Sequence, residues 1–327
     1  MKKVSAVIAN WNGSHHLKKC LPSILDQSYD NLEVIVVDNN SHDNSKEIVQ
    51  KFDARWVPLE KNEGLAAALN RGAEVSEGDL LLFLNNDMRF DKYFVKEMVS
   101  TIGRNKNIFS VDAVQYSWDG GEKVHLATFI NEAFRKESIS ADRVESKIGE
   151  GIVVTQHDVD REVETVYSSA ANMMVNKNVF SSLGGFDERM TAGSEDVDIC
   201  FRAWAKGYKT VFQPSAICYH RVGGSSKSKE GKKMRYRGTI EGGLIFATKL
   251  LPLFYIITTL GRRIGGGIKD AACLRGGLVK RRSSVFYRYS RSLRRILEER
   301  SIIYRNEDIS LRQLLDKLIG LKKKVKK

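Results

Sequence analysis

The sequence predicts an α/β fold with a doubly wound, mainly parallel sheet flanked by helices. Between residues 4 and 116, apolar and β-branched runs alternate with segments whose apolar residues recur at helical spacing. Two of the runs, residues 33–37 (EVIVV) and 80–84 (LLLFL), pass directly into Asn and Asp residues. In an open α/β sheet, ligands bind at the carboxyl ends of the strands, so these two polar ends are expected to line one crevice.

Each element of this part has a local signal. Leu17, Leu21 and Leu25 fall at helical spacing, although Pro22 is expected to kink or split that helix. Ser45 can cap the next helix by accepting from its free amides. In chain order we expect a strand from Val4, a helix over 17–25, a strand over 33–37, a helix over 46–52, a helix anchored by Leu65 and Leu69, and strands over 80–84 and 109–116.

The following part of the chain is less regular. Residues 117–164 are polar, charged and weakly periodic, so we expect an excursion from the sheet with mobile parts. Residues 165–175 alternate well enough for a strand, and residues 177–183 form a short helix that a Gly-Gly pair ends. An acidic helix start at residues 194–198 and a strand-like run at 210–213, followed by a lone histidine, complete the expected core.

Charge divides the chain into two regions. Its 327 residues can form one large domain or two, and a content of 42% hydrophobic residues argues against wholesale disorder. Residues 1–220 hold 25 Lys+Arg and 32 Asp+Glu, a net of −7, whereas residues 221–327 hold 28 and 8, a net of +20; together they give the +13 of the whole chain. We therefore expect a core domain at 1–222, a flexible basic linker at 223–239, and a basic helical region at 240–327.

The cysteines and the amino terminus indicate the compartment. No apolar signal region precedes Val4, so secretion is not indicated. The four cysteines have neither C-x-x-C nor zinc spacing, and free thiols suit a reducing cytoplasm.

The basic region has features of a membrane-surface segment. Residues 244–260 form an apolar stretch of 17 residues, but Lys249 and Pro252 interrupt it, so it is not expected to span a bilayer. Apolar stripes at helical spacing follow among many arginines at 285–297 and 311–319. We expect this region to attach to an anionic membrane surface. The alternative is that its helices pack on the core domain with solvated basic faces.

The polar strand ends are suited to a metal and a nucleotide. Asp87 presents hard oxygen ligands at the end of the 80–84 strand, as Mg²⁺ or Mn²⁺ carrying a diphosphate requires. The alternative is an Asn-rich turn, since Asn and Asp are common turn residues. Asp38 ends the 33–37 strand in the same way, and the repetition favours a ligand crevice.

Five stretches in sequence order resemble the inverting family 2 glycosyltransferases of the GT-A fold, especially the rhamnosyltransferase-like branch that builds bacterial surface polysaccharide. The resemblance covers about residues 3–225. It implies metal-assisted transfer of a hexosyl or deoxyhexosyl group from a nucleotide-sugar donor to a glycan or lipid-linked acceptor. The stretches are residues 4–13 (VSAVIANWNG), 36–45 (VVDNNSHDNS), 62–72 (NEGLAAALNRG), 82–87 (LFLNND) and 184–198 (GGFDERMTAGSEDVD).

The resemblance assigns roles to individual residues. Asp196 matches the catalytic base, and an anion in the first turn of a helix is independently stabilised by the amide dipoles. Asp87 and His220 match the metal site. Asn85 stands where the family commonly has Asp, so we expect it to bind water or ribose. The other implied donor-binding residues are Asn10, Asn12, Asp38, Asn62, Gly64 and Asn70.

Two other function classes compete with glycosyl transfer. The +20 region is suited to nucleic acid, but it has no known reading motif, and its apolar segment suits a membrane better. Nucleotidyl transfer uses a similar sheet, but no Gly-rich signature stands near the amino terminus. We expect a peripheral enzyme at the inner face of the cell membrane, with residues 117–164 shaping the acceptor side and no nucleic-acid partner.

Overall fold

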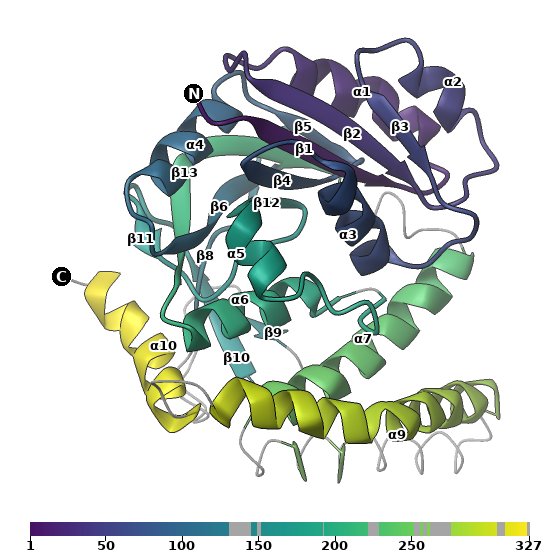
Figure 1. Cartoon of the computed structure of the whole chain (residues 1–327), viewed down its shortest axis with the longest axis vertical. Helices are drawn as coiled ribbons and strands as arrows, with labels where there is room; N and C mark the ends of the chain where they lie inside the picture. The colour runs from purple at the N-terminus through teal and green to yellow at the C-terminus, as the bar shows by residue number, and fades with distance from the viewer. Residues whose placement is uncertain are drawn as a thin grey trace.

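The computed structural model describes residues 1–130, 145–148, 152–191, 193–221, 229–251, 256–257, 260–261, 276–305 and 311–325. Its centre is a sheet with the strand order β11-β13-β6-β12-β4-β1-β2-β3, with β5 beside β13 and β7 beside β6 (Figure 1). The strands are β1 (Val4–Asn10), β2 (Leu32–Asp38), β3 (Arg55–Pro58), β4 (Leu80–Asn85), β5 (Met88–Phe90), β6 (Ile108–Ser117), β7 (Lys123–His125), β11 (Val163–Glu164), β12 (Asn172–Asn176) and β13 (Lys209–His220).

The sheet is mixed, with parallel pairing in its larger part. Strands β4, β1, β2 and β3 are parallel neighbours, and β13 is parallel to β6. Strand β12 runs antiparallel to both β4 and β6 and joins the two parallel parts. The predicted α/β class with a mainly parallel, doubly wound sheet is confirmed. Strand β12 is much shorter than the strand expected over 165–175.

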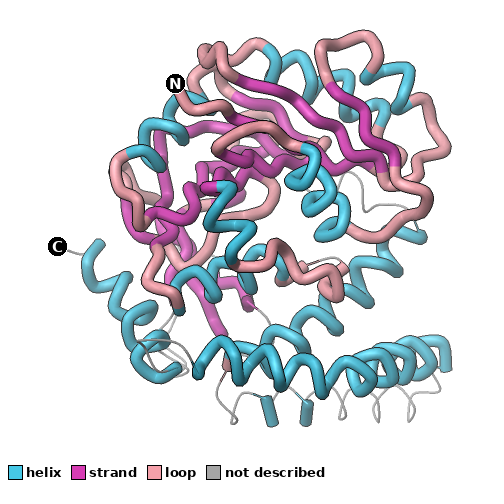
Figure 2. Tube along the Cα trace, viewed as in Figure 1, coloured by secondary structure: helices cyan, strands magenta, loops and turns pink. Residues whose placement is uncertain are grey.

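Alternate residues of the strands pack on opposite faces. Ile8, Val36 and Leu82 belong to the apolar cluster under helices α1 (Ser14–Leu25), α2 (Ser45–Val49) and α4 (Phe94–Gly103). Val7 and Phe83 belong to the cluster under α3 (Leu65–Val75), α5 (Lys177–Ser182) and α6 (Glu195–Ala205). Both faces are therefore covered by helices, as Figure 2 shows. Helix α1 continues through Pro22, which does not split it.

The predicted excursion after β6 contains more regular structure than its composition indicates. Strands β8 (Ala127–Ile130), β9 (Glu145–Ile148) and β10 (Ile152–His157) form a second, antiparallel sheet in the order β8-β10-β9. Phe129 and Val154 of this sheet are buried in a third apolar cluster. Residues 131–144, the central part of the excursion, lie outside the described part of the chain.

The carboxyl-terminal helices pack on the core domain through the same third cluster. They are α7 (Lys229–Leu250), α9 (Gly276–Arg305) and α10 (Leu311–Val325). Leu244 and Phe246 of α7, with Ile296 of α9 and Leu318 of α10, are buried against Phe201 and Trp204 of α6. For these residues the structure matches the packing alternative. Attachment to a membrane stays a prediction.

Two expectations concern the linker and the apolar stretch that follows it. The linker expected over 223–239 is helical from Lys229 onward, and residues 222–228 lie outside the described part of the chain. Within the described ranges, no helix is sufficiently long and apolar to cross a bilayer.

Candidate active site

The carboxyl ends of β1, β2 and β4 meet as expected, and their polar side chains are joined. Asn10 pairs with Asp38 in register, while Ala9 pairs with Asn85. The Asn10 amide donates to Asp38 Oδ1 over 2.8 Å, and Asn86 Nδ2 donates to Asn10 Oδ1 over 2.7 Å. All three side chains are buried. A continuous polar line therefore runs along the sheet edge.

Gly13 lets the first loop approach this line. A Cβ atom at residue 13 would lie 2.1 Å from Asn86 Nδ2 and 2.5 Å from Asn10 Oδ1, distances that real Cβ atoms do not show. Any larger side chain would have to break the Asn10–Asn86 bond. The loop after β1 thus lies directly on the ends of two strands.

Asn12 shapes the turn that follows Asp38. The backbone amide of Asn12 donates to Ser41 Oγ over 2.7 Å, and its side-chain oxygen accepts from the backbone amide of His42 over 2.8 Å. Ser41 Oγ in turn donates to Asp38 Oδ1 over 2.6 Å. The structure thus brings Asn10, Asn12 and Asp38 together, as the sequence predicts, around one polar turn.

Gly64 begins α3 in a conformation that disfavours other residues. Its φ is +97°, and a Cβ there would lie 2.9 Å from the carbonyl oxygen of Thr191. The Asn62 side chain accepts from the Gly64 amide over 3.1 Å, and Asn39 donates to the Gly64 carbonyl over 2.9 Å. The Asn-rich turn after β2 and the start of α3 are therefore one unit.

Asp87, which follows the end of β4, and His220, the last residue of β13, lie together. The distance from His220 Nε2 to Asp87 Oδ1 is 3.3 Å, and Asp87 is 3% exposed. His220 Nδ1 is 2.9 Å from Gln115 Oε1. Because the amide nitrogen of Gln115 donates to Asn172 Oδ1 over 3.2 Å, its oxygen faces the histidine as an acceptor. In the neutral ring, Nδ1 then carries the proton and Nε2 presents its lone pair toward Asp87.

These two groups fit a divalent cation. Asp87 Oδ1 is a buried oxygen without a hydrogen-bond partner in the described structure. Two ligand atoms in adjacent positions around a cation at about 2.1 Å are about 3 Å apart, close to the separation seen here. Among the described residues no cluster of three or more His, Cys, Asp or Glu side chains could hold a metal, so the remaining ligands would come from substrate and water.

Asp196 lies at the start of α6 and is tied to the same sheet edge. Its Oδ2 accepts from the backbone amide of Ala170 over 3.3 Å. The carbonyl of the next residue, Ala171, accepts from the backbone amide of Asn85 over 3.2 Å. Two short backbone links therefore connect the carboxylate at 196 to the residue two positions before Asp87.

The electrostatics at the start of α6 differ from the expectation. Burial raises the pKa of Asp196, and this exceeds the lowering by the amides of Ala170 and Val197. Glu195, which is 3% exposed, has its pKa raised to about 8 by burial and by the charge of Asp196. The amide dipoles of the helix start therefore do not hold both carboxyls ionised. Desolvation of these two adjacent acids outweighs them.

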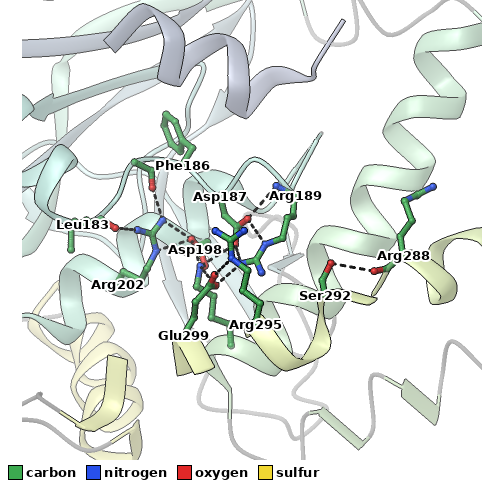
Figure 3. A network of polar contacts seen from close by, with 12 residues as sticks. Leu183, Phe186, Asp187, Arg189, Asp198, Arg202, Arg288, Ser292, Arg295 and Glu299 are labelled. Carbon is green, nitrogen blue, oxygen red and sulfur yellow. Dashed lines mark hydrogen bonds and ion pairs between the residues drawn. The ribbon is translucent and has the colours of Figure 1, made fainter. Parts of the chain in front are cut away.

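Asn70 and Arg202 make contacts that the sequence did not indicate. The Asn70 side chain donates to the carbonyl oxygen of Phe186 and accepts from its amide, both over 2.9 Å, so it holds the loop before α6. Arg202 Nη2 lies 2.6 Å from Asp198 Oδ2, and the arginine also donates to carbonyl oxygens of the same loop (Figure 3). These residues stabilise the loop before α6. Donor binding by Asn70 stays a prediction.

Sequence reasoning missed two polar groups near the start of α6. His125 Nε2 lies 2.7 Å from Asp112 Oδ2, and both residues are buried. Lys249 lies 3.1 Å from carboxylate oxygens of both Asp187 and Asp198. No signal in the sequence pairs these residues, because each pair joins segments that only the fold brings together.

The chain is similar in sequence to known glycosyltransferases. Residues 5–161 match the model of the family described as glycosyl transferase family 2. These residues make up a little under half of the chain, and over them it is similar to glycosyl transferase family 2. The glycosyltransferase AglE of Haloferax volcanii is 28% identical over 225 residues, which is 66% of this chain and 66% of AglE. The poly-beta-1,6-N-acetyl-D-glucosamine synthase of Staphylococcus epidermidis is 23% identical and covers 67% of this chain and 50% of the synthase.

The chain also resembles a solved structure. GalNAc-T7, crystallised with UDP, GalNAc and Mn²⁺, superposes with a TM-score of 0.60 at 15% identity, over 87% of this chain and 54% of that one. This likeness confirms the GT-A type fold. The chain spans 66%, 30%, 15% and 18% of the length of the first four curated relatives that it matches.

Proposed function

We propose that the chain is an inverting glycosyltransferase that moves a sugar from a nucleotide-sugar donor to a hydroxyl of a glycan or lipid-linked acceptor. The observation that carries the proposal is the linked pair of sites at one sheet edge. Asp87 and His220 lie on one side, and Asp196 is tied to Asn85 through the backbone of residues 170 and 171. A leaving-group site beside a carboxylate base is what direct displacement needs.

In this proposal Asp87 and His220 would hold a divalent cation, which would supply positive charge against the charge of the departing diphosphate. Asp196 accepts the proton of the acceptor hydroxyl. The acceptor oxygen forms its bond to the anomeric carbon on the face opposite the diphosphate, and the bond between that carbon and the phosphate oxygen breaks. Asp38 and the Asn10–Asn12 loop bind the nucleoside part, and the Asn62–Gly64 turn faces the ribose and diphosphate.

The family and the names of relatives support the biological setting. One relative is a polysaccharide synthase, and another is a glycosyltransferase. We therefore place the reaction in cell-surface polysaccharide synthesis, at the cytoplasmic face of the cell membrane. The lipid-linked form of the acceptor is suggested by the +20 net charge of residues 221–327, which would attract an anionic leaflet.

The test is binding followed by product analysis. Purified full-length protein with Mn²⁺ is heated with UDP-, GDP- and dTDP-linked sugars in turn. We expect one base class to stabilise the fold, by about 2.7 kcal/mol at a concentration 100 times its Kd. With that donor and a hydroxyl acceptor, NMR should show a product whose anomeric configuration is opposite to that of the donor. Stabilisation by no nucleotide sugar, or a retained configuration, would contradict the proposal.

A further inference from the structure

Strands β6 and β7 carry a buried pair of an aspartate and a histidine. Asp112 of β6 and His125 of β7 are 0% and 6% exposed, and the histidine ring nitrogen Nε2 is 2.7 Å from Asp112 Oδ2. Strand β7 pairs antiparallel with β6, with His125 opposite Gln115, and the His125 ring reaches Asp112 three residues away on β6. A buried ionic pair is costly to desolvate and contributes little net stability by itself. The pair therefore calls for an explanation other than stability alone.

The pair shares a backbone segment with Asp196. Asp112 Oδ1 accepts from the backbone amide of Ser169 over 3.2 Å. Asp196 Oδ2 accepts from the next amide, that of Ala170, over 3.3 Å. Two carboxylates from different elements thus hold consecutive amides of one chain segment. A shift of Asp112 would move the segment that orients the Asp196 carboxylate.

The same pair acts on Asp196 through charge. Burial alone would lower the pKa of His125, but the Asp112 and Asp196 carboxylates outweigh it and raise that pKa above its usual value. Burial raises the pKa of Asp196, and the positive charge of His125 counteracts this rise. The imidazolium and the base thus favour each other's charged form.

The other groups that face these two residues oppose the charge on Asp196 or leave it unchanged. Glu195 and Cys200 belong to the same helix, and the ring centroid of Tyr167 lies 6.1 Å from that of His125. The side chains of Glu195, Cys200 and Tyr167 are neutral when protonated and negative when deprotonated, so none of them supplies a positive charge. Gln156 of β10, whose amide nitrogen is 3.5 Å from His125 Nδ1, carries no charge. His125 is thus the cationic group among these neighbours of Asp196.

We propose that Asp112 and His125 are positioning residues for the transfer reaction, which keep Asp196 oriented and ionised so that it can accept the proton of the acceptor hydroxyl. This inference rests on the proposed function, in which Asp196 is the base. It differs from a purely structural role of the pair, because a structural role predicts no effect of His125 on the titration of Asp196.

The first test needs no substrate. The imidazole resonances of the full-length protein are followed by NMR as a function of pH, and that of His125 is assigned by its loss in His125→Gln. We expect Asp196→Asn to lower the His125 pKa by about 1 unit, because an opposite charge nearby is removed. Asp158→Asn, which removes an exposed carboxylate paired with Lys123, is the matched control and should leave it unchanged. If the His125 pKa is the same in Asp196→Asn as in the wild-type protein, the inference is overturned.

The second test uses the pH profile of kcat/KM. In His125→Gln the acid limb should move to higher pH by about 1 unit, which lowers activity about tenfold below the limb and far less above it. Asp112→Asn keeps a hydrogen-bond partner for the ring and should move the limb in the same direction. His157→Gln, on the neighbouring strand β10, should not move it. A loss of activity by the same factor at every pH would mean that the pair is only structural.

The two tests separate this inference from the proposed function. Wild-type turnover in Asp196→Asn would remove the base assignment and the inference with it. If Asp196→Asn loses turnover as expected but the acid limb of the kcat/KM profile does not move in His125→Gln, the inference is overturned and the base assignment stays in place.

Discussion

The Nζ atom of Lys249 lies 3.1 Å from Asp198 Oδ1, and this contact joins helix α7 to helix α6 two residues after the proposed base. Lys249 is also 3.1 Å from Asp187 Oδ2 in the loop that precedes α6. Arg189 pairs with the same Asp187 and with Glu299 of α9 (Figure 3). The lysine that interrupts the apolar stretch of the sequence is thus a buried contact between the carboxyl-terminal helices and the acceptor-side loop.

Removal of this charge should destabilise the fold. Lys249→Met keeps the length of the side chain but removes one of the two cations that contact each of the buried carboxylates Asp187 and Asp198. We expect a loss of about 3–5 kcal/mol, the range for breaking one partner of a buried ion pair. Urea unfolding followed by circular dichroism measures it. Arg294→Met, which breaks an exposed pair with Glu298, is the control and should cost less than about 1 kcal/mol. Equal effects of the two variants would refute the assignment.

The proposed base can be tested by a nearly isosteric change. Asp196→Asn should reduce turnover by about 10² or more, because the acceptor hydroxyl loses its proton acceptor. Donor and Mn²⁺ binding should stay close to wild type, since Asp196 does not contact Asp87 directly. Turnover is measured with the donor identified by thermal stabilisation, and Asp158→Asn serves as the matched carboxylate control. Transfer at the wild-type rate would require a different base.

The metal site gives a separate prediction. Asp87→Ala should abolish Mn²⁺-dependent donor binding in calorimetry, because the buried Oδ1 is the oxygen nearest His220 Nε2. Chelation of the metal with EDTA should have the same effect on the wild-type protein. Asp119→Ala, an exposed carboxylate that accepts from Ser117, should bind donor normally. Unchanged Mn²⁺-assisted binding in Asp87→Ala would move the site elsewhere.

Glu195 should make stability depend on pH. Its pKa is raised from 4.5 to about 8 in the folded protein by burial and the neighbouring carboxylate. Between these values the folded state binds the proton more tightly than the unfolded state, so stability present below pH 4.5 is lost as the pH rises toward 8. Glu195→Gln should reduce this loss. Urea midpoints at pH 5 and pH 8.5 compare the two proteins, and parallel pH dependences would count against the raised pKa.

Membrane attachment is tested by flotation. Full-length protein should float with anionic vesicles at low salt, since each Lys or Arg near the surface contributes about 1 kcal/mol. Raised salt or zwitterionic vesicles should abolish flotation. Protein that stays at the bottom with anionic vesicles would leave the carboxyl-terminal helices as packing elements, which is how their described apolar residues are used in this structure.

The sequence predicts the parts of the fold that local signals determine. The apolar run at 80–84 becomes β4, and the run at 33–37 lies inside β2, because such residues gain most when both faces of a strand are covered. The end of β4 beside the ends of β1 and β2 follows from parallel pairing. The placement of Asn10, Asp38 and Asp87 at one edge could therefore be expected.

The remaining features depend on distant contacts. Residues 165–171 alternate like a strand, yet Val166 bonds to Thr128 and Ser168 to Cys200, so the strand β12 begins only at Asn172. The pKa of Asp196 depends on how much protein covers it, which a helix-start pattern does not report. Two partners of Lys249, Asp198 and Asp187, are 51 and 62 residues away in the chain.

The Lys249 contact also affects the order in which the protein becomes functional during synthesis. Residues up to 220 complete the central sheet, and domains begin to fold while the rest of the chain is still being made. The contacts of Lys249 with Asp187 and Asp198 form only after residue 249 has left the ribosome, and Glu299 follows fifty residues later. A nascent chain from which about the first 225 residues have emerged would therefore hold the complete central sheet before the Lys249 contacts with the loop preceding α6 can form. Donor binding should precede transfer competence in the life of each molecule.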